Sequence, residues 1–162
     1  MIRTGTAHYE GLGKSGKGRV STQSGVLADA RYDFNTRFEN EAGTNPEELV
    51  AAAHASCFTM ALSFALAGAG YTDGTLDTKA AITLDKDGDG FTITRSALTL
   101  TAKIPGIAQA EFDTITAGAK AGCPISKLLN AEITLDATLE AQKEKDRRDG
   151  WRPGGLAWSA AG

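Results

Sequence analysis

Two cysteines, Cys57 and Cys123, are the side chains of this sequence best suited to chemistry. A thiolate is a strong nucleophile, but a free cysteine has a pKa of about 8.5, so its neighbours decide whether it reacts. Two thiols are too few for the disulfide framework of a small secreted protein, and in a reducing compartment they are more often buried or reactive than permanently bridged. The pair therefore indicates either redox chemistry or two inert core residues.

Polar residues near Cys57 favour reactivity. His54 precedes Cys57 by one helical turn, Glu47 lies further back, and Arg37 stands upstream in FNTRFEN. Lowering the pKa of a thiol to about 6.5 requires about 2.7 kcal/mol of preferential stabilisation of the anion, which one guanidinium in a partly desolvated site can supply. Arginine stays charged, and a carboxylate can hold its planar fork in place. Arg37 and Glu47 are therefore candidates for the activating groups.

The second cysteine has a different setting. Cys123 stands directly before Pro124 in KAGCPIS, where it suits the N-cap of a short helix. Helix N-termini favour anions, so this thiol is also a candidate for a lowered pKa. The residues alone leave open which sulfur attacks first.

The element that must position Cys57 is the uncharged run over residues 49–72. Asn45 suits the N-cap of a helix, Pro46 suits its first position, and Gly68 suggests its end. The run is long enough to cross a membrane, but its hydrophobicity is modest and no second such run accompanies it. We therefore predict a long central helix, apolar nearly all round and buried inside the protein.

The surrounding segments indicate strands and shorter helices. Helical stretches are predicted at residues 108–120 and just after Pro124, and the two-residue alternation typical of strands occurs in residues 79–84, 91–103 and 132–139. These elements do not alternate as βαβ units. The sequence therefore predicts an α+β fold, with a mostly antiparallel sheet packed against the central helix.

Three patterns resemble ligand sites without fitting them. GLGKSGKG, residues 11–18, nearly matches a phosphate-binding loop, but glycine stands where the hydroxyl is needed, no apolar strand precedes it and no helix pattern follows it. DKDGDG, residues 85–90, opens like a calcium loop, but Ser96 replaces the required glutamate. We predict turns between strands at both places. Four potential metal ligands lack the short paired spacings of structural zinc sites, so no metal is expected: His8, His54, Cys57 and Cys123.

Bulk properties limit the partners and the compartment. The net charge of −3 and the scattered basic residues provide no surface for nucleic acid. The first residues contain no apolar signal segment, so we expect a cytoplasmic protein that does not enter the membrane. We predict one domain over residues 1–140. Residues 141–162 are first charged and then rich in Gly, Pro and Trp, which predicts a flexible tail.

Three blocks of this sequence closely resemble the osmotically inducible protein C (OsmC) family, whose sister group is the organic hydroperoxide resistance (Ohr) proteins. They are FNTRFE, GTNPEELVAAAHASCF and KAGCPIS, with both cysteines in register, and the similarity runs from about residue 8 to residue 140. The resemblance implies an OsmC-like intertwined homodimer, with strands wrapped about two central helices and active sites at the subunit interface. A second subunit would also cover the apolar helix of so small a chain.

The resemblance implies a thiol peroxidase that reduces organic hydroperoxides to alcohols, and hydrogen peroxide less well, in oxidative or osmotic stress defence. Cys57 would attack the peroxide and become a sulfenic acid, and Cys123 would condense with it into a disulfide. The catalytic arginine and its carboxylate partner would be Arg37 and Glu47. The Ohr group has its arginine earlier in the chain, which makes Arg19 a second candidate.

The resemblance also implies what accompanies the enzyme. No bound cofactor is expected, and an external dithiol or a lipoylated protein would restore the thiols. Four side chains could line an entrance for a substrate with an apolar body, although the core is their more ordinary place: Phe34, Phe38, Phe58 and Met60. His54 sides with the OsmC branch, because the Ohr group has an aromatic residue there; a structural histidine is a simpler interpretation than a general base.

Two functions of other classes compete with the peroxidase. The chain could be a non-catalytic stress protein in which both cysteines are bystanders and a cavity holds an apolar ligand. It could also be a disulfide oxidoreductase that acts on proteins. Thiol titration and a comparison of peroxide with protein disulfide as substrate discriminate among the three.

Overall fold

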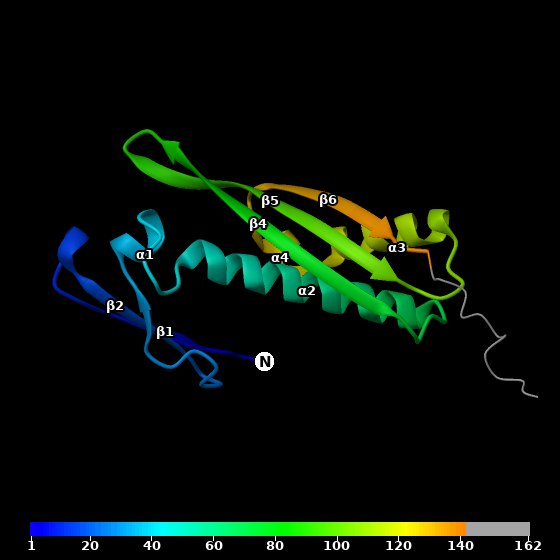
Figure 1. Ribbon diagram of the computed structural model, residues 1–162, viewed down its shortest axis with the longest axis horizontal. Coiled ribbons are helices and arrows are strands. Elements are labelled where there is room, and N and C mark those ends of the chain that lie inside the picture. Colours follow the sequence, from blue (N-terminus) through cyan, green and yellow to red (C-terminus); the bar gives the residue numbers. More distant parts are fainter. Residues whose placement is uncertain (142–162) are drawn as a thin grey trace, which may run out of the picture.

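A computed structural model of the protein describes residues 1–141 of the 162. It is an α+β fold of two three-stranded sheets and four α-helices (Figure 1). In chain order the elements are β1 (Gly5–Glu10), the 3-10 turn η1 (Gly13–Ser15), β2 (Lys17–Thr22), β3 (Ala30–Tyr32), α1 (Phe34–Phe38), α2 (Pro46–Gly68), β4 (Thr75–Asp87), β5 (Gly90–Lys103), α3 (Gln109–Gly122), α4 (Pro124–Leu128) and β6 (Glu132–Leu139). Apart from Ala141, the predicted tail lies outside the described residues.

Strands β1, β2 and β3 form one antiparallel sheet, followed directly by α1. We call residues 1–44 the N-terminal unit. It extends away from the rest of the chain at the left of Figure 1. The glycine- and lysine-rich segment predicted as a turn is η1, which joins β1 to β2. All six residues of β1 are exposed, so this sheet has little core of its own.

The second part, residues 45–141, is called the body. Strands β4 and β5 form a long antiparallel hairpin, and β6 pairs with β5 in parallel. The predicted turn DKDGDG is confirmed, because it closes this hairpin between Asp87 and Gly90. The sheet is mostly antiparallel, as predicted, with the β5–β6 pair as the exception within the described residues.

Helix α2 starts as the sequence predicts. The Asn45 side chain accepts a hydrogen bond from the Glu48 N–H at 2.8 Å, and Pro46 occupies the first turn. By length and composition alone α2 could span a membrane, but the core helix of a soluble protein passes the same test. It packs beneath β4 and against α3 and α4 (Figure 1).

The predicted burial of α2 is seen only in part in the single chain. We expected a helix covered nearly all round, but the single chain buries one stripe, at a spacing of four residues: His54, Phe58, Leu62 and Leu66. The opposite side is open, with Met60 63% and Phe64 73% exposed. The reason is that β4, α3 and α4 all approach from one side.

The core of the protein lies entirely in the body. Its largest members come from α2, β5 and α3: Phe58, Leu62, Leu98, Leu100 and Phe112. Cys123 belongs to this cluster and is 0% exposed, while Cys57 packs against its edge. The N-terminal unit contributes no residue to the cluster.

A tight joint connects the two parts. Gly43 has φ of 147°, and a β-carbon there would lie 2.6 Å from the Thr36 side chain and 2.7 Å from the Arg31 carbonyl oxygen. Only glycine fits that conformation and that space. The next residue, Thr44, donates its N–H to the same carbonyl at 2.9 Å, so the chain is fixed to the N-terminal unit until α2 begins.

Candidate active site

The structure brings the two cysteines together although they are far apart in sequence. Cys57 lies in the middle of α2 and Cys123 between α3 and α4, and their sulfur atoms are 3.0 Å apart. Both are free thiols. Cys57 is partly exposed, whereas Cys123 is fully buried. A substrate arriving from solvent can therefore reach Cys57 more readily than Cys123.

At this separation the two thiols titrate as a pair that shares a proton. Burial raises the pKa of the Cys57 thiol, and its hydrogen bond with Cys123 raises it further. Burial also acts to raise the pKa of Cys123, but its interactions with Cys57 and with Ser126 outweigh burial and lower the pKa. These opposite directions favour the thiolate form at Cys123 over that at Cys57.

Arg37 and Glu47 form the second pair of predicted site residues. Arg37 ends α1 and Glu47 stands in the first turn of α2. The guanidinium donates to both carboxylate oxygens, from Nη2 at 2.6 Å and from Nε at 3.0 Å. Such a two-point contact fixes the plane of the guanidinium. The remaining guanidinium donors are left free to bind another anion.

The Arg37–Glu47 pair borders a broad cavity of about 480 Å³ between α2, the β4–β5 hairpin and the segment before β6. Its apolar walls include Leu84, Phe91 and Leu129. A smaller cavity of about 190 Å³ lies on the other side of Arg37, lined by Tyr32, Phe34 and Phe38 among others. Phe34 and Phe38 thus line a cavity beside the arginine and do not belong to the core, which the sequence had favoured for them.

The Arg37–Glu47 pair is not beside the cysteines within one chain. Glu47 and Cys57 lie on the same helix, where a rise of about 1.5 Å per residue separates them by about 15 Å along the axis. None of the groups that shift the pKa of Cys57 is an arginine. The structure therefore assembles the predicted residues as two separate pairs.

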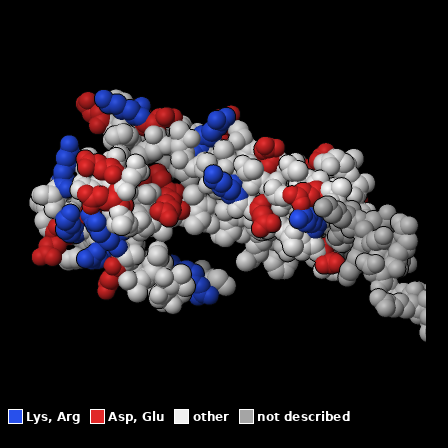
Figure 2. Space-filling view, viewed as in Figure 1, with Lys and Arg blue, Asp and Glu red and all other residues white. Residues whose placement is uncertain are grey.

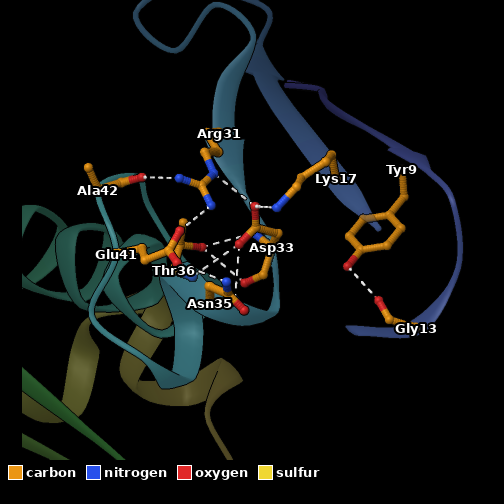
Figure 3. A network of polar contacts seen from close by, with 9 residues as sticks. All are labelled: Tyr9, Gly13, Lys17, Arg31, Asp33, Asn35, Thr36, Glu41 and Ala42. Atoms are coloured by element: carbon orange, nitrogen blue, oxygen red, sulfur yellow. Dashed lines mark hydrogen bonds and ion pairs between the residues drawn. The ribbon is translucent and has the colours of Figure 1, made fainter. Parts of the chain in front are cut away.

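A network of charged and polar groups holds α1, and with it Arg37, in place (Figure 3). The almost fully buried Asp33 accepts hydrogen bonds from the N–H groups of Asn35 and Thr36, which caps α1. Arg31 Nε donates to the same carboxylate at 2.8 Å, and Lys17 lies 3.6 Å away. The Arg31 hydrogen bond is the main cause that lowers the pKa of Asp33 to about 2.

The same arginine links the cap to the joint. Its Nη2 atom donates to Glu41 at 2.6 Å, and Glu41 also accepts from the Asn35 side chain at 2.9 Å. Arg31 also donates to the Ala42 carbonyl (Figure 3). The sequence analysis missed this group of residues. Alternating acidic and basic residues around the short helix FNTRF were the available signal.

His54 lies at 0% exposure on the buried stripe of α2. Its Nδ1 atom is 2.6 Å from the Ser96 hydroxyl and its Nε2 atom is 2.9 Å from the Ser126 hydroxyl. Burial lowers its pKa, so the ring is neutral at pH 7. A histidine with both ring nitrogens bonded agrees with the structural role that the sequence favours. The two serines were not singled out from the sequence.

The other predicted residues are dispersed. Arg19 lies on β2, exposed and opposite His8 and Arg31 in the strand register. Phe58 is fully buried in the core, whereas Met60 is exposed. Within residues 1–141 no three His, Cys, Asp or Glu side chains come together as metal ligands.

Comparisons with known proteins agree with the family resemblance seen in the sequence. The model of the family described as "OsmC-like protein" matches residues 38–138. Peroxiredoxin OsmC of Escherichia coli is 56% identical over 139 residues, which cover 86% of this chain and 97% of the relative. The organic hydroperoxide resistance protein OhrB of Bacillus subtilis is 26% identical over 124 residues, 76% of this chain and 89% of the relative.

Solved structures show the same fold. The crystal structure of an organic hydroperoxide resistance protein from Elizabethkingia anophelis superposes with a TM-score of 0.63 at 25% identity, covering 88% of this chain and 99% of that one. The matched family blocks contain Cys57, Cys123 and Glu47, and the E. coli relative aligns along almost its whole length. The chain therefore belongs to the OsmC-like protein family.

Proposed function

We propose that this protein is a thiol peroxidase that reduces organic hydroperoxides to alcohols, and hydrogen peroxide less well, as part of the defence against oxidative or osmotic stress. The observation that carries the proposal is the pair of free thiols 3.0 Å apart, one reachable and one buried. The names of two relatives, a peroxiredoxin and an organic hydroperoxide resistance protein, support the same activity.

The first step is the attack of Cys57 on the distal peroxide oxygen. Cys57 loses its proton to Cys123, its neighbour at 3.0 Å. The S–O bond forms as the O–O bond breaks, and the leaving alkoxide takes up the proton to become the alcohol. Cys57 is oxidised to a sulfenic acid.

The second step forms the disulfide. The Cys123 thiolate attacks the Cys57 sulfur, the S–O bond breaks, and the leaving hydroxide takes up a proton to become water. A dithiol reductant then attacks the disulfide and restores both thiols; we propose a small dithiol or a lipoylated protein for this role. The active domain comprises residues 1–140 and works in the cytoplasm without a bound cofactor.

Arg37, held by Glu47, stabilises the charge that develops on the peroxide oxygens. One chain keeps this ion pair about 15 Å along the helix from Cys57, so we propose that a second copy supplies it. In a two-fold homodimer whose α2 helices pack antiparallel near Ala52, Glu47 of one copy lies level with Cys57 of the other.

Two further observations support the homodimer. The exposed side of α2 carries small residues near its middle, Ala52, Ala53 and Ser56, which let two helices approach closely, followed by the apolar Met60 and Phe64. Apart from contacts such as Phe38 against Phe91, much of the N-terminal unit also stands away from the body, and Figure 2 shows open space between the two. A second copy would fill that space and cover the apolar side of α2.

A single-turnover experiment tests the activity. The reduced protein is mixed anaerobically with one equivalent of cumene hydroperoxide or hydrogen peroxide, and the products are analysed by mass spectrometry. We expect fast loss of both thiols to a Cys57–Cys123 disulfide, with the organic peroxide preferred, and no fast reaction in Cys57→Ser. Slow oxidation of the unaltered protein would contradict the proposal and favour an apolar-ligand protein. Faster reaction with a protein disulfide than with peroxide would indicate an oxidoreductase.

A mixing experiment tests the origin of the arginine. Arg37→Ala and Cys57→Ser are each expected to be inactive, but subunit exchange between them creates sites that combine Cys57 of one chain with Arg37 of the other. Recovery of activity on mixing is the expected result if the partner supplies the arginine. No recovery, despite proven exchange, would place Cys57 and Arg37 of one site in the same chain.

A further inference from the structure

Three polar side chains from three elements, two of them buried and one half-buried, meet beside the cysteine pair. His54 of α2 lies between Ser96 of β5 and Ser126 of α4, at 2.6 and 2.9 Å. His54 and Ser96 are both 0% exposed. The peroxidase steps above use none of the three. A buried polar chain of this kind is costly unless each donor finds an acceptor, so its hydrogen positions can be worked out by accounting for donors.

Ser96 determines which atom donates in its hydrogen bond with His54. Within residues 1–141 its hydroxyl has one hydrogen-bond partner, Nδ1 of His54. If Nδ1 carried the proton, Ser96 would accept it and its own O–H would have no acceptor among the described residues. If Nδ1 is the acceptor, the Ser96 O–H is satisfied. The neutral ring then carries its proton on Nε2.

This tautomer sets the direction of the next bond. The Nε2–H of His54 donates to the Ser126 oxygen at 2.9 Å. The Ser126 hydrogen is therefore free to point elsewhere. Ser126 stands three residues after Cys123, in the first turn of α4, where the Lys127 N–H closes the turn on the Cys123 carbonyl at 3.0 Å. At that spacing the Ser126 hydroxyl can reach the Cys123 sulfur.

The chemistry of Cys123 agrees with this direction. Burial acts to raise the pKa of Cys123, whereas Cys57 and then the N–H and hydroxyl of Ser126 act to lower it. A hydroxyl that donates to sulfur stabilises the thiolate more than the thiol. No charged side chain is required for this effect.

We propose that Ser96, His54 and Ser126 form a one-way hydrogen-bond chain that directs the Ser126 hydroxyl hydrogen at the Cys123 sulfur, which makes His54 a positioning residue for the resolving thiol. The inference rests on the proposed peroxidase function and assigns the chain to its second step. There the Cys123 thiolate forms the S–S bond while the S–O bond of the Cys57 sulfenic acid breaks. Once the alkoxide has taken up the proton that Cys57 passed to Cys123, the chain stabilises the Cys123 thiolate for that attack, without adding or removing a proton overall.

The first experiment measures Cys123 without peroxide. In a Cys57→Ala background Cys123 is the sole thiol, and its ionisation is followed by the ultraviolet absorbance of the thiolate during a pH titration, because a buried sulfur reacts poorly with alkylating reagents. We expect Ser126→Ala and His54→Phe each to lower the thiolate fraction at a fixed pH by roughly tenfold. His54→Gln should restore much of it, because its amide N–H can replace Nε2–H.

Ser96→Ala is the most telling variant, since Ser96 reaches Cys123 only through His54 and Ser126. Releasing Nδ1 lets the ring adopt its other tautomer, which turns the Ser126 hydrogen towards His54, so the thiolate fraction should fall roughly threefold. Thr59→Val is the matched control: it removes a half-buried hydroxyl that joins α2 to β4, bonded to Thr78 at 2.7 Å. It should leave the ionisation of Cys123 unchanged.

The second experiment separates this inference from the proposed function. With the Cys57 thiol present, single-turnover oxidation by cumene hydroperoxide resolves sulfenic acid formation from disulfide formation. We expect Ser96→Ala and Ser126→Ala to slow disulfide formation several-fold, so that sulfenic acid accumulates. If the serine and histidine variants lose folding stability but keep wild-type Cys123 ionisation and resolution rate, the chain is only structural and the inference is wrong. Absence of any peroxide reaction would contradict the proposed function, while the first experiment would still decide the inference.

Discussion

The N-terminal unit and the body are stabilised by different forces. The body has a core of large apolar side chains, with Phe58, Leu62 and Phe112 fully buried. The N-terminal unit buries chiefly polar groups, Asp33 and Thr36, and is organised by ion pairs with Arg31. The body therefore fixes the sulfur atoms through packing, while the arginine is fixed through charge. Variants in the two regions should separate stability from activity.

The largest effect on stability is expected in the body. Phe58→Ala empties a site that is 0% exposed, which should lower the free energy of unfolding by about 3–5 kcal/mol. Chemical denaturation measures the loss. Leu12→Ala, at a residue of the N-terminal unit that is 90% exposed, is the control and should change stability by less than about 0.5 kcal/mol. Equal losses from both variants would remove the distinction between the regions.

Among variants that keep both cysteines, the largest effect on activity is expected in the N-terminal unit. Arg37→Ala removes the guanidinium that we propose faces the peroxide, and it should lower the rate of peroxide reduction roughly 100-fold or more. The free energy of unfolding should change little, because the ion pair is partly exposed. Arg95→Ala is the control, since Arg95 pairs with Glu132 on the surface of the body. A rate unchanged by Arg37→Ala would redirect the search to Arg19.

A smaller loss of activity is expected from the support of Arg37. Asp33→Asn keeps the shape of the cap but weakens the hydrogen bonds that Arg31 and the N–H groups of α1 make with it. Peroxide reduction should slow several-fold because α1 no longer holds Arg37 in one orientation. Steady-state kinetics measures the change, and the exposed Asp136→Asn on β6 serves as the control. A variant with full activity would show that Glu47 alone positions the arginine.

Acid should affect the N-terminal unit through the same carboxylate. The pKa of Asp33 falls from an ordinary 3.8 to about 2, chiefly through its hydrogen bond with Arg31. A lowered pKa contributes stability at pH values above 3.8, and this contribution is lost as the pH falls towards 2. Hydrogen exchange should therefore rise in residues 30–38 over that range, before it rises in α2. Asp33→Asn should abolish this early loss, and its persistence would assign the loss to another group.

Much of the fold could be predicted from local patterns. The start of α2 followed from Asn45 and Pro46, and β6 from two-residue alternation. Strand β4 is longer than predicted, Thr75–Asp87, because ladder hydrogen bonds continue through charged residues that hide the alternation. The all-exposed β1 offers no buried face, so hydrophobic patterning could not mark it.

The candidate site was harder to predict from local sequence patterns. Spacing and residue type pointed to Cys57, Arg37 and Glu47, but the pairing of Cys57 with Cys123 depended on the family resemblance. Ser96 and Ser126 escaped notice because a single serine in a strand or short helix has many ordinary roles. Their relation to His54 exists only after β5, α2 and α4 have packed together.

The joint at Gly43 bears on how quickly two chains would find each other. Glycine packed against Thr36 and the Arg31 carbonyl, with Thr44 bonded to the same oxygen, leaves no slack segment before α2. Each free chain would then already hold its N-terminal unit at the angle to α2 that the proposed homodimer requires. Little conformational entropy would remain to be lost on association. Encounter and orientation, rather than a folding event, would set the association rate, and replacing Gly43 by a bulkier residue would slow assembly without touching a sulfur atom.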